Sequence, residues 1–276
     1  MRTVRFPDGT TVPALGQGTW MMAETPARRA EEIAALRAGL DLGLTLIDTA
    51  EMFGEGAAEW LVGEAIAGRR DEVFIVSKAY PHNASRARLP RACEASLDRL
   101  GTDRIDLYLL HWRGDVPLGE TIEAMGRLVE GGKILRWGVS NLDIDDMDDL
   151  VEAGGATCAT DQILYNLTRR GPELDLIPWL AQRAIPVMAY SPIERGRLLS
   201  RPALRSIADR KGTSPAQIAL AWLLRRPGII AIPKAGSIAH VADNRRAADI
   251  ELDADDLADL ETAFPSPNRR CPLEML

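Results

Sequence analysis

Apolar residues follow two alternating patterns along the chain. Short runs of β-prone apolar residues alternate with longer segments in which apolar positions recur at helical spacing. Such alternation predicts parallel strands joined by crossover helices. We expect the strands at Leu15–Gly18, Leu44–Asp48, Val73–Lys78, Ile105–His111, Trp137–Ser140, Thr160–Leu164, Pro186–Tyr190 and Ile229–Pro233.

Amphipathic segments lie between and after these strands. Ser214 followed by Pro215 is typical of a helix start, and Gly101 after an apolar run is typical of a helix stop. Because eight strands close a (β/α)8 TIM barrel, we expect an α/β fold of this type. The helices are expected at Arg28–Leu42, Ala57–Ala67, Leu89–Leu100, Leu118–Glu130, Ile144–Glu152, Leu174–Gln182, Pro215–Leu224, Ile238–Ala247 and Asp253–Phe264.

The two ends of the chain add to this barrel. Pro7-Asp8-Gly9 is a turn sequence between short β-prone stretches, so we expect an N-terminal β-hairpin and not a signal peptide. A short proline-rich tail begins at Pro265. No long linker, change of composition or low-complexity stretch divides the chain, and residues 1–276 are therefore expected to form a single domain.

A doubly wound open sheet is the competing topology, because it uses the same alternation of strands and helices. That fold normally carries a GxGxxG turn after its first strand, and none occurs here. A P-loop sequence is absent as well. A nucleotide would therefore have to be held in another way.

Composition narrows the classes of partner. Hydrophobic residues make up 46% of the chain, as in an ordinary globular protein. The formal net charge of -7 argues against a nucleic acid or an anionic membrane surface as partner. No run approaches the ~20 apolar residues that span a bilayer. Cys93, Cys158 and Cys271 lack the spacing of a zinc site or a disulfide framework, which favours the reducing cytoplasm. Because a barrel closes without a partner, a monomer is expected.

Candidate chemistry follows from the barrel assignment, because barrel sites gather at the C-terminal ends of the strands. An acid, an amine and an imidazole at one mouth would handle protons, since a buried Asp–Lys pair shifts the pKa of its neighbours. Taken singly, each polar residue there is more often a structural cap, an ion pair or a core residue. The residues at these strand ends are Asp48, Lys78, His111, Ser140, Asn141, Gln162, Tyr190 and Lys234.

Six segments, which together span most of the chain, resemble in order and spacing the signatures of the aldo-keto reductase family. The pattern is most similar to small bacterial members with short loops. This resemblance implies a TIM barrel that binds NADPH and reduces carbonyl compounds. The segments are LIDTAEMFGEGAAEWLVGEAI, VFIVSKAYP, SLDRLGTDRIDLYLLHW, GKILRWGVSNL, VMAYSP and IAIPKAGSIAHVADN.

The resemblance also implies a catalytic tetrad of Asp, Tyr, Lys and His. Asp48, Lys78 and His111 match three of these places, but Phe53 stands where DTAxxYG would put the tyrosine. In the family the tyrosine protonates the carbonyl oxygen, its pKa lowered by the lysine. Losing a positioned acid costs ~10²–10⁴-fold in rate, so carbonyl reduction is expected to be impaired. In isolation Phe53 would read as a packing residue.

The resemblance assigns further residues to the cofactor. Ser140, Asn141 and Gln162 would hold the nicotinamide amide and Tyr190 would stack on the ring, although Ser140-Asn141 could instead cap the helix near Ile144. Backbone amides after Tyr190 would meet the pyrophosphate. The remaining residues implied in cofactor binding are Gly18, Thr19, Trp20, Asp48, Ser191, Pro192, Ile193, Gly196, Leu198, Ile232, Lys234, Ala235, His240, Asp243 and Asn244.

Lys234 lies in a loop that leads to a predicted helix, where a cation and N-terminal amides could meet a 2′-phosphate, which favours NADPH over NADH. Family members often carry an arginine six residues beyond this lysine, but here the residue is His240, which would grip phosphate less firmly. Asp243 and Asn244 match the residues expected near ribose and adenine. Trp20, Phe53, Trp112 and the tail would line the substrate pocket.

Two functions remain open at this point. The first is a reductase whose carbonyl chemistry is impaired, or redirected to imines, by Phe53. An imine that solvent has already protonated needs no acid from the protein. The second is a cofactor-binding sensor that does not turn over, which the presence of Asp48, Lys78 and His111 disfavours. A metal site is not expected, because the three histidines, His82, His111 and His240, lack ligand spacing.

Overall fold

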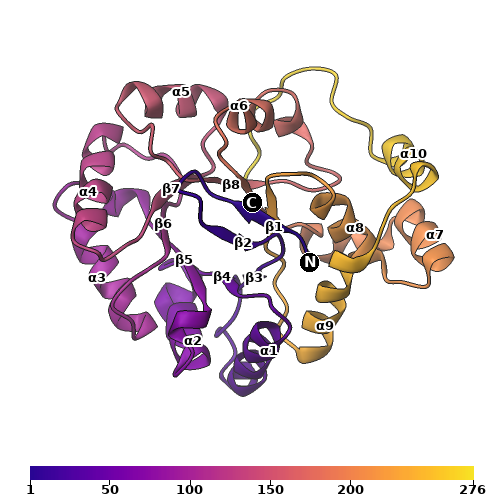
Figure 1. The fold of residues 1–276 in the computed structure, drawn as a ribbon, viewed down its shortest axis with the longest axis horizontal. Helices are drawn as coiled ribbons and strands as arrows, with labels where there is room; N and C mark the ends of the chain where they lie inside the picture. Colours follow the sequence, from indigo (N-terminus) through magenta and orange to yellow (C-terminus); the bar gives the residue numbers. More distant parts are fainter.

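A computed structural model describes all 276 residues and contains a closed barrel of parallel strands (Figure 1). Each strand pairs with the next along the chain, and Gly16 N donates a 2.9 Å hydrogen bond to Ala231 O, which joins the last strand to the first. The predicted (β/α)8 fold is therefore confirmed. The strands are β3 (Gln17–Gly18), β4 (Leu46–Asp48), β5 (Phe74–Ala79), β6 (Leu107–Leu110), β7 (Trp137–Ser140), β8 (Asp161–Leu164), β9 (Val187–Tyr190) and β10 (Ile229–Ala231).

Helices form a ring outside the strands (Figure 1). Nine of them match the predicted segments, and α7 was not predicted. None is both long and apolar enough to cross a membrane. The helices are α1 (Arg29–Asp41), α2 (Ala57–Ile66), α3 (Leu89–Leu100), α4 (Leu118–Glu130), α5 (Ile144–Glu152), α6 (Leu176–Gln182), α7 (Pro202–Lys211), α8 (Pro215–Leu224), α9 (Ile238–Arg246) and α10 (Ala254–Ala263).

Local sequence signals fix several helix ends. Ser214 caps α8 by accepting a hydrogen bond from Gln217 N, as predicted. The cap of α5 is Asp143, which forms a capping box with Asp146. The alternative in which Ser140-Asn141 caps this helix is therefore wrong, and these two side chains are available to the site.

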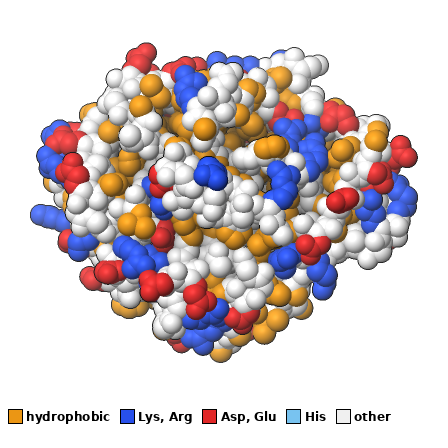
Figure 2. Space-filling view, viewed as in Figure 1, with side chains coloured by type: hydrophobic (Ala, Val, Ile, Leu, Met, Phe, Trp, Pro, Cys, Tyr) orange, Lys and Arg blue, Asp and Glu red, His pale blue; other side chains and the backbone are white.

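The predicted N-terminal hairpin crosses one end of the barrel (Figure 1). Strand β1 (Thr3–Arg5) pairs antiparallel with β2 (Thr11–Pro13). Phe6 stacks on Phe74 at the start of β5 with ring centroids 5.4 Å apart, and Arg136 Nη2 lies 2.9 Å from an Asp8 carboxylate oxygen. The hairpin thus seals the N-terminal end of the barrel. Figure 2 shows this face, on which cationic and anionic side chains are intermixed.

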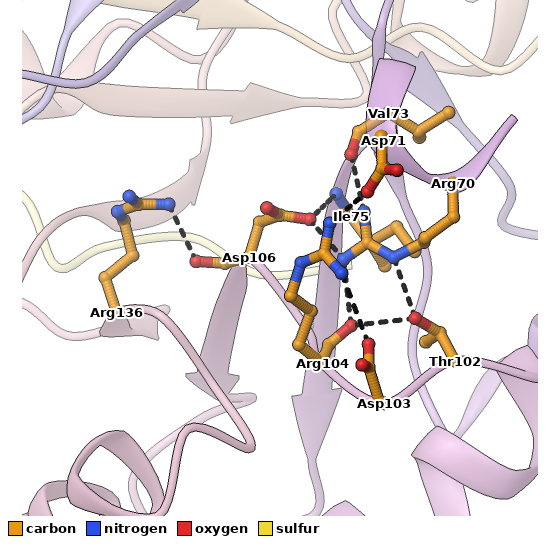
Figure 3. A network of polar contacts seen from close by, with 9 residues as sticks. All are labelled: Arg70, Asp71, Val73, Ile75, Thr102, Asp103, Arg104, Asp106 and Arg136. Carbon is orange, nitrogen blue, oxygen red and sulfur yellow. Dashed lines mark hydrogen bonds and ion pairs between the residues drawn. The ribbon is translucent and has the colours of Figure 1, made fainter.

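A polar network ties the first residues of neighbouring strands together at the same end (Figure 3). The Asp106 carboxylate accepts hydrogen bonds from Arg70 Nη2 at 2.7 Å and from Ile75 N at 2.9 Å. Arg136 Nη1 donates to the Asp106 carbonyl at 2.9 Å. Asp106, just before β6, is thereby linked to β5 on one side and to β7 on the other. The network sets the register at the sealed end.

Close packing of the barrel interior leaves little room for change. A Cβ on Gly18 would lie 2.7 Å from Ile232 O, so only glycine lets β3 approach the end of β10 this closely. Trp222, Tyr108 and Tyr165 are among the largest fully buried side chains. Lys78 belongs to the same group although it is charged, which directs attention to the opposite end of the barrel.

Candidate functional site

A cavity of about 740 Å³ opens at the C-terminal ends of the strands. Its position is the one expected for a barrel site. Most of the predicted site residues line it, and further members come from the β3–α1 loop and from the C-terminal residues. The predicted site residues that line the cavity are Gly18, Trp20, Asp48, Phe53, His111, Trp112, Ser140, Asn141, Gln162, Tyr190, Ser191, Pro192, Ile193, Gly196, Ile232 and Lys234.

Asp48 and Lys78 form a buried ion pair at the floor of this cavity. Lys78 Nζ lies 2.8 and 2.9 Å from the two Asp48 carboxylate oxygens and 2.9 Å from Thr49 O. These acceptors engage all three protons of the ammonium group. Burial lowers the pKa of Lys78, and the charge of Asp48 opposes that shift. The pair therefore holds a positive charge in a fixed position beneath the cavity.

His111 follows β6 and is only 8% exposed. Its Nδ1 is buried and has no hydrogen-bond partner. Burial, together with the nearby Lys78 charge, lowers the pKa of His111 to about 3. The imidazole is therefore neutral at physiological pH and can act as a polar group but not as a strong acid.

Phe53 lies between these two groups. Its ring centroid is 4.7 Å from Lys78 Nζ and 5.9 Å from the His111 ring centroid. The turn that places it passes through Gly54 and Gly56, whose φ angles of 58° and 90° suit glycine. Ala58 packs beneath the ring. The residue thus adjoins both Lys78 and His111 and contributes no ionisable group to the cluster.

The predicted amide-binding residues form a hydrogen-bonded set beside the cluster. Tyr190 Oη donates to Asn141 Oδ1 at 2.8 Å, and Asn141 Nδ2 donates to the His111 carbonyl at 3.1 Å. Ser140 Oγ donates to Gln162 O at 2.8 Å. Gln162 Nε2 donates to Asp48 Oδ1 at 2.7 Å, so this amide orients the buried carboxylate. Asn141 has a φ of 60°, which turns its side chain across the strand ends.

The loop after β9 reaches over the cavity towards Trp20. The Arg195 guanidinium lies 4.3 Å from the Trp20 ring centroid. Glu194 is buried, and its carboxylate accepts hydrogen bonds from Asn166 at 2.7 Å and from Arg169 at 2.9 Å. The φ angles of Glu194 and Arg195 are 50° and 54°, in the left-handed region that few side chains adopt. The two anchored contacts hold this strained turn in place.

Arg28 and Lys234 make one end of the cavity cationic, and we call this end the far end. A Cβ built on Gly236 would lie 3.0 Å from Arg28 Nη2 and 3.1 Å from Lys234 Nζ. Both cations line the cavity. His240, predicted nearby, is exposed on α9 and does not line the cavity.

Six other predicted cofactor or catalytic residues also lie outside the cavity lining. Asp243 accepts hydrogen bonds from Ser214 Oγ at 2.7 Å and from Gln217 Nε2 at 2.8 Å, so it faces α8. Asn244 is buried on α9 and likewise does not line the cavity. Thr19, Lys78, Leu198 and Ala235 are buried behind the cavity wall.

Sequence reasoning missed some of the lining. Arg28 immediately precedes α1, Glu32 lies in its first turn, and Arg195 comes from a loop without periodic pattern. Met275 and Leu276 reach the cavity because the tail folds back, as the ion pair between Glu274 and Arg169 shows. The tail was expected to line the substrate pocket, but none of its residues was named. The remaining lining residues that were not predicted are Met21, Glu24, Thr25, Met52 and Pro233.

Comparison with known proteins agrees with this geometry. The model of the aldo/keto reductase family matches residues 14–264. The chain is 50% identical to methylglyoxal reductase YeaE of Escherichia coli (strain K12) over 281 aligned residues. This alignment covers 100% of the chain and 99% of the E. coli protein. A Klebsiella pneumoniae aldo/keto reductase crystallised with NADP and acetate is 54% identical, with 99% of each chain covered and a TM-score of 0.97.

A second Klebsiella pneumoniae structure, of an aldo-keto reductase in complex with NADPH, is 53% identical with a TM-score of 0.97. It covers 100% of this chain and 99% of that chain. The likeness therefore extends over the whole fold, including every strand end that lines the cavity.

Proposed function

This chain belongs to the aldo/keto reductase family, and we propose that it reduces small carbonyl compounds with NADPH, the 2-oxoaldehyde methylglyoxal among them. The observation that carries the proposal is the Asp48–Lys78–His111 cluster at the floor of the cavity. The name of the E. coli relative supports methylglyoxal as a substrate to test. We propose further that Phe53 slows this reaction and favours substrates that bring their own proton.

The cavity fits the cofactor by the chemistry of its two ends. Asn141 and Gln162 offer amide groups that can pair with the nicotinamide amide, beside the His111–Phe53 floor. Arg28 and Lys234 offer cations for phosphate at the far end. When bound, NADPH supplies the hydride that reduces the substrate carbon. The side chains of the protein bind and orient the substrate and stabilise developing charge.

Lys78 and His111 prepare the floor for a polar substrate. The fixed ammonium charge of Lys78 stabilises negative charge that develops on a carbonyl oxygen nearby, and it does so without reorganisation. The neutral imidazole of His111 can hydrogen-bond to the same oxygen. Trp20 and Trp112 supply apolar walls that limit water around the reacting group.

Neither group is a good proton donor. The Lys78 protons are bound to Asp48 and Thr49, and the low pKa of His111 leaves its imidazole uncharged. At position 53 a tyrosine hydroxyl would supply the acid, but Phe53 has none. The proton for a carbonyl oxygen must therefore come from water, at a cost of about 10²–10⁴-fold in rate.

A cyclic imine avoids this requirement. Its nitrogen can be protonated in solution, and the resulting iminium carbon then accepts hydride from NADPH to give an amine without any further proton. The buried Lys78 charge opposes binding of the cation, but Asp48 offsets part of that repulsion. We propose cyclic imines as the second substrate class on the strength of the missing acid.

The test is NADPH oxidation by the wild-type protein and by Phe53→Tyr with methylglyoxal, a set of simple aldehydes and a cyclic imine. Restoring the hydroxyl should raise aldehyde turnover by about 10²–10⁴-fold and leave imine turnover nearly unchanged. Cofactor affinity, followed by fluorescence, should stay the same in both proteins.

Phe53→Leu is the matched control, because it changes the ring without adding a hydroxyl. It should recover no carbonyl activity. If the Phe53→Tyr substitution changes carbonyl turnover and imine turnover by the same factor relative to wild type, the proposal of imine reduction is wrong. If neither protein turns over any substrate while NADPH still binds tightly, a non-catalytic cofactor sensor becomes the better account.

A further inference from the structure

The far end of the cavity holds two cations, of which one has a single long ionic contact and the other has none. Lys234 Nζ takes part in no ion pair and no hydrogen bond. Arg28 has one ionic contact, 3.6 Å from its Nε to Glu31, and this contact leaves Nη2 free. Both nitrogens converge on Gly236, so they lie close enough for one anion to contact both.

Two like charges in such proximity repel each other, and an anion between them relieves the repulsion. Glu32 is the carboxylate nearest to this point, with its Cγ 3.7 Å from the Gly236 position. One of its oxygens accepts a 2.9 Å hydrogen bond from Ala23 N. Glu32 forms no ion pair with either cation. The protein therefore leaves a place for an external anion here although its net charge is -7.

Another cation of the cavity, Arg195, indicates which phosphate is left for Arg28 and Lys234. Arg195 lies against Trp20, and its charge acts on Tyr190, so it belongs to the end where the nicotinamide is proposed to lie. Within a dinucleotide the pyrophosphate is nearer to the nicotinamide than the adenosine ribose is. Arg195 is therefore suited to the pyrophosphate, and the two cations that meet at Gly236 remain for the other phosphate of NADPH.

We propose that Arg28, the residue before α1, binds the 2′-phosphate of NADPH together with Lys234 and thereby sets the preference for NADPH over NADH. This inference rests on the proposed function. A 2′-phosphate monoester carries more charge than either phosphate of the pyrophosphate, so it gains more from two cations. His240 is exposed outside the cavity, and Arg28 supplies from the turn before α1 the second cation that this position lacks.

Gly236 makes this arrangement possible. A methyl group there would stand 3.0 and 3.1 Å from the two cationic nitrogens and would occupy the space between them. Gly236→Ala should therefore displace both side chains and weaken binding of the 2′-phosphate. The backbone itself has no conflict, because the nearest atoms are the mobile ends of Arg28 and Lys234.

The experiment is a fluorescence titration of NADPH and NADH into wild type, Arg28→Gln and Arg29→Gln. Arg29 is the matched control, since it points away from the cavity and pairs with Glu64 at 2.7 Å. Arg28→Gln should weaken NADPH binding roughly tenfold and leave NADH binding unchanged, because only NADPH carries the 2′-phosphate. Arg29→Gln should change neither, and Arg28→Lys should restore part of the loss.

Competition by 2′,5′-ADP and 5′-AMP separates the 2′-phosphate from the rest of the nucleotide. Arg28→Gln should weaken 2′,5′-ADP alone, and Gly236→Ala should do the same. Equal weakening of both nucleotides would overturn the proposal in favour of a general structural role, and no change in either would overturn it outright.

Turnover with saturating cofactor distinguishes a failure of this inference from a failure of the proposed function. If wild type reduces carbonyls but Arg28→Gln keeps full NADPH selectivity, the assignment of Arg28 is wrong and the function stands. If no substrate is reduced but Arg28→Gln loses NADPH selectively, the binding assignment holds and the reductase function is wrong.

Discussion

The two ends of the barrel are built on opposite principles. At the N-terminal end the hairpin covers the strands, and the Asp106 carboxylate accepts hydrogen bonds from Arg70 and Ile75. At the C-terminal end His111 Nδ1 has no partner and Lys234 has no counter-charge. The sealed end contributes to stability, while the open end presents the uncompensated charge of Lys234 to the cavity; buried unpaired polar groups also occur elsewhere, at Tyr108 and Asp161.

Positive φ angles of non-glycine residues cluster around the cavity, although Ala184, just before β9 at the opposite end, also has a φ of 56°. Asn141, Ser191, Glu194 and Arg195 have φ angles of 60°, 48°, 50° and 54°, and all four lie around the cavity. No non-glycine residue of the hairpin has a positive φ. Strain of this kind persists where surrounding contacts enforce it, and here it coincides with the proposed cofactor loop.

The largest expected effect concerns Phe53, the apolar side chain that lies beside Lys78 and His111. Phe53→Tyr should raise carbonyl turnover by about 10²–10⁴-fold and give it a new pH dependence. The tyrosine acts only when protonated, so the gain should disappear at alkaline pH, and the nearby Lys78 charge should bring this loss to lower pH than for a free phenol. A pH profile of turnover measures it; a gain that persists unchanged at high pH would exclude the hydroxyl as the acid.

The ion pair at the open end should matter for folding as well. Asp48→Asn leaves the Lys78 charge buried without its partner, which costs about 3–5 kcal/mol of unfolding free energy. Urea denaturation provides the value. A loss no larger than that of a surface substitution would mean that Lys78 is not charged in the native protein.

His111 should make stability depend on acid. Its folded pKa of about 3 lies below the ordinary value of 6.5, so the unfolded chain binds the proton first as the pH falls. The contribution of the neutral His111 to the free energy of unfolding is complete above pH 6.5. It declines as the pH falls towards 3, by up to about 1.4 kcal/mol per pH unit. Comparison of unfolding free energies for wild type and His111→Asn between pH 7 and pH 5 isolates it. Parallel curves for the two proteins would contradict this pKa.

The sealed end should respond most weakly. Asp106→Asn keeps the shape of the network but removes the charge facing Arg70, which should cost about 1–2 kcal/mol. Urea denaturation should detect the loss, while NADPH affinity should remain that of wild type. A change in cofactor affinity as large as that of an active-site variant would show that the two ends are not independent.

Most of the fold could be predicted, because barrel strands and their helices have strong periodic signals. The structure shortens several strands: β6 begins at Leu107, and Ile105 forms only an isolated bridge with Ile134. Helix α7 was missed although Pro202 at its start and Gly212 after its end are ordinary helix signals. Its polar sequence buries few residues, so the apolar pattern that revealed the other helices is faint.

The site was predictable only in part, for a physical reason. Asp48 and Lys78 end strands, and strand ends meet at one mouth whatever the loops do. Arg28 and Arg195 reach the cavity through loop geometry, which leaves no period in the sequence. Asp243 was expected near the cofactor but is engaged by α8 residues, a contact between helices that the local sequence does not encode.

We propose that the cavity floor lacks only an acid, at the position of Phe53. The most direct test of this proposal is single-turnover oxidation of pre-bound NADPH by methylglyoxal in wild type and Phe53→Tyr, which removes cofactor binding and product release from the rate. We expect a slow step in the wild-type protein and an increase of about 10²–10⁴-fold in the variant. Equal rates in the two proteins would contradict it, because another group would then be supplying the proton.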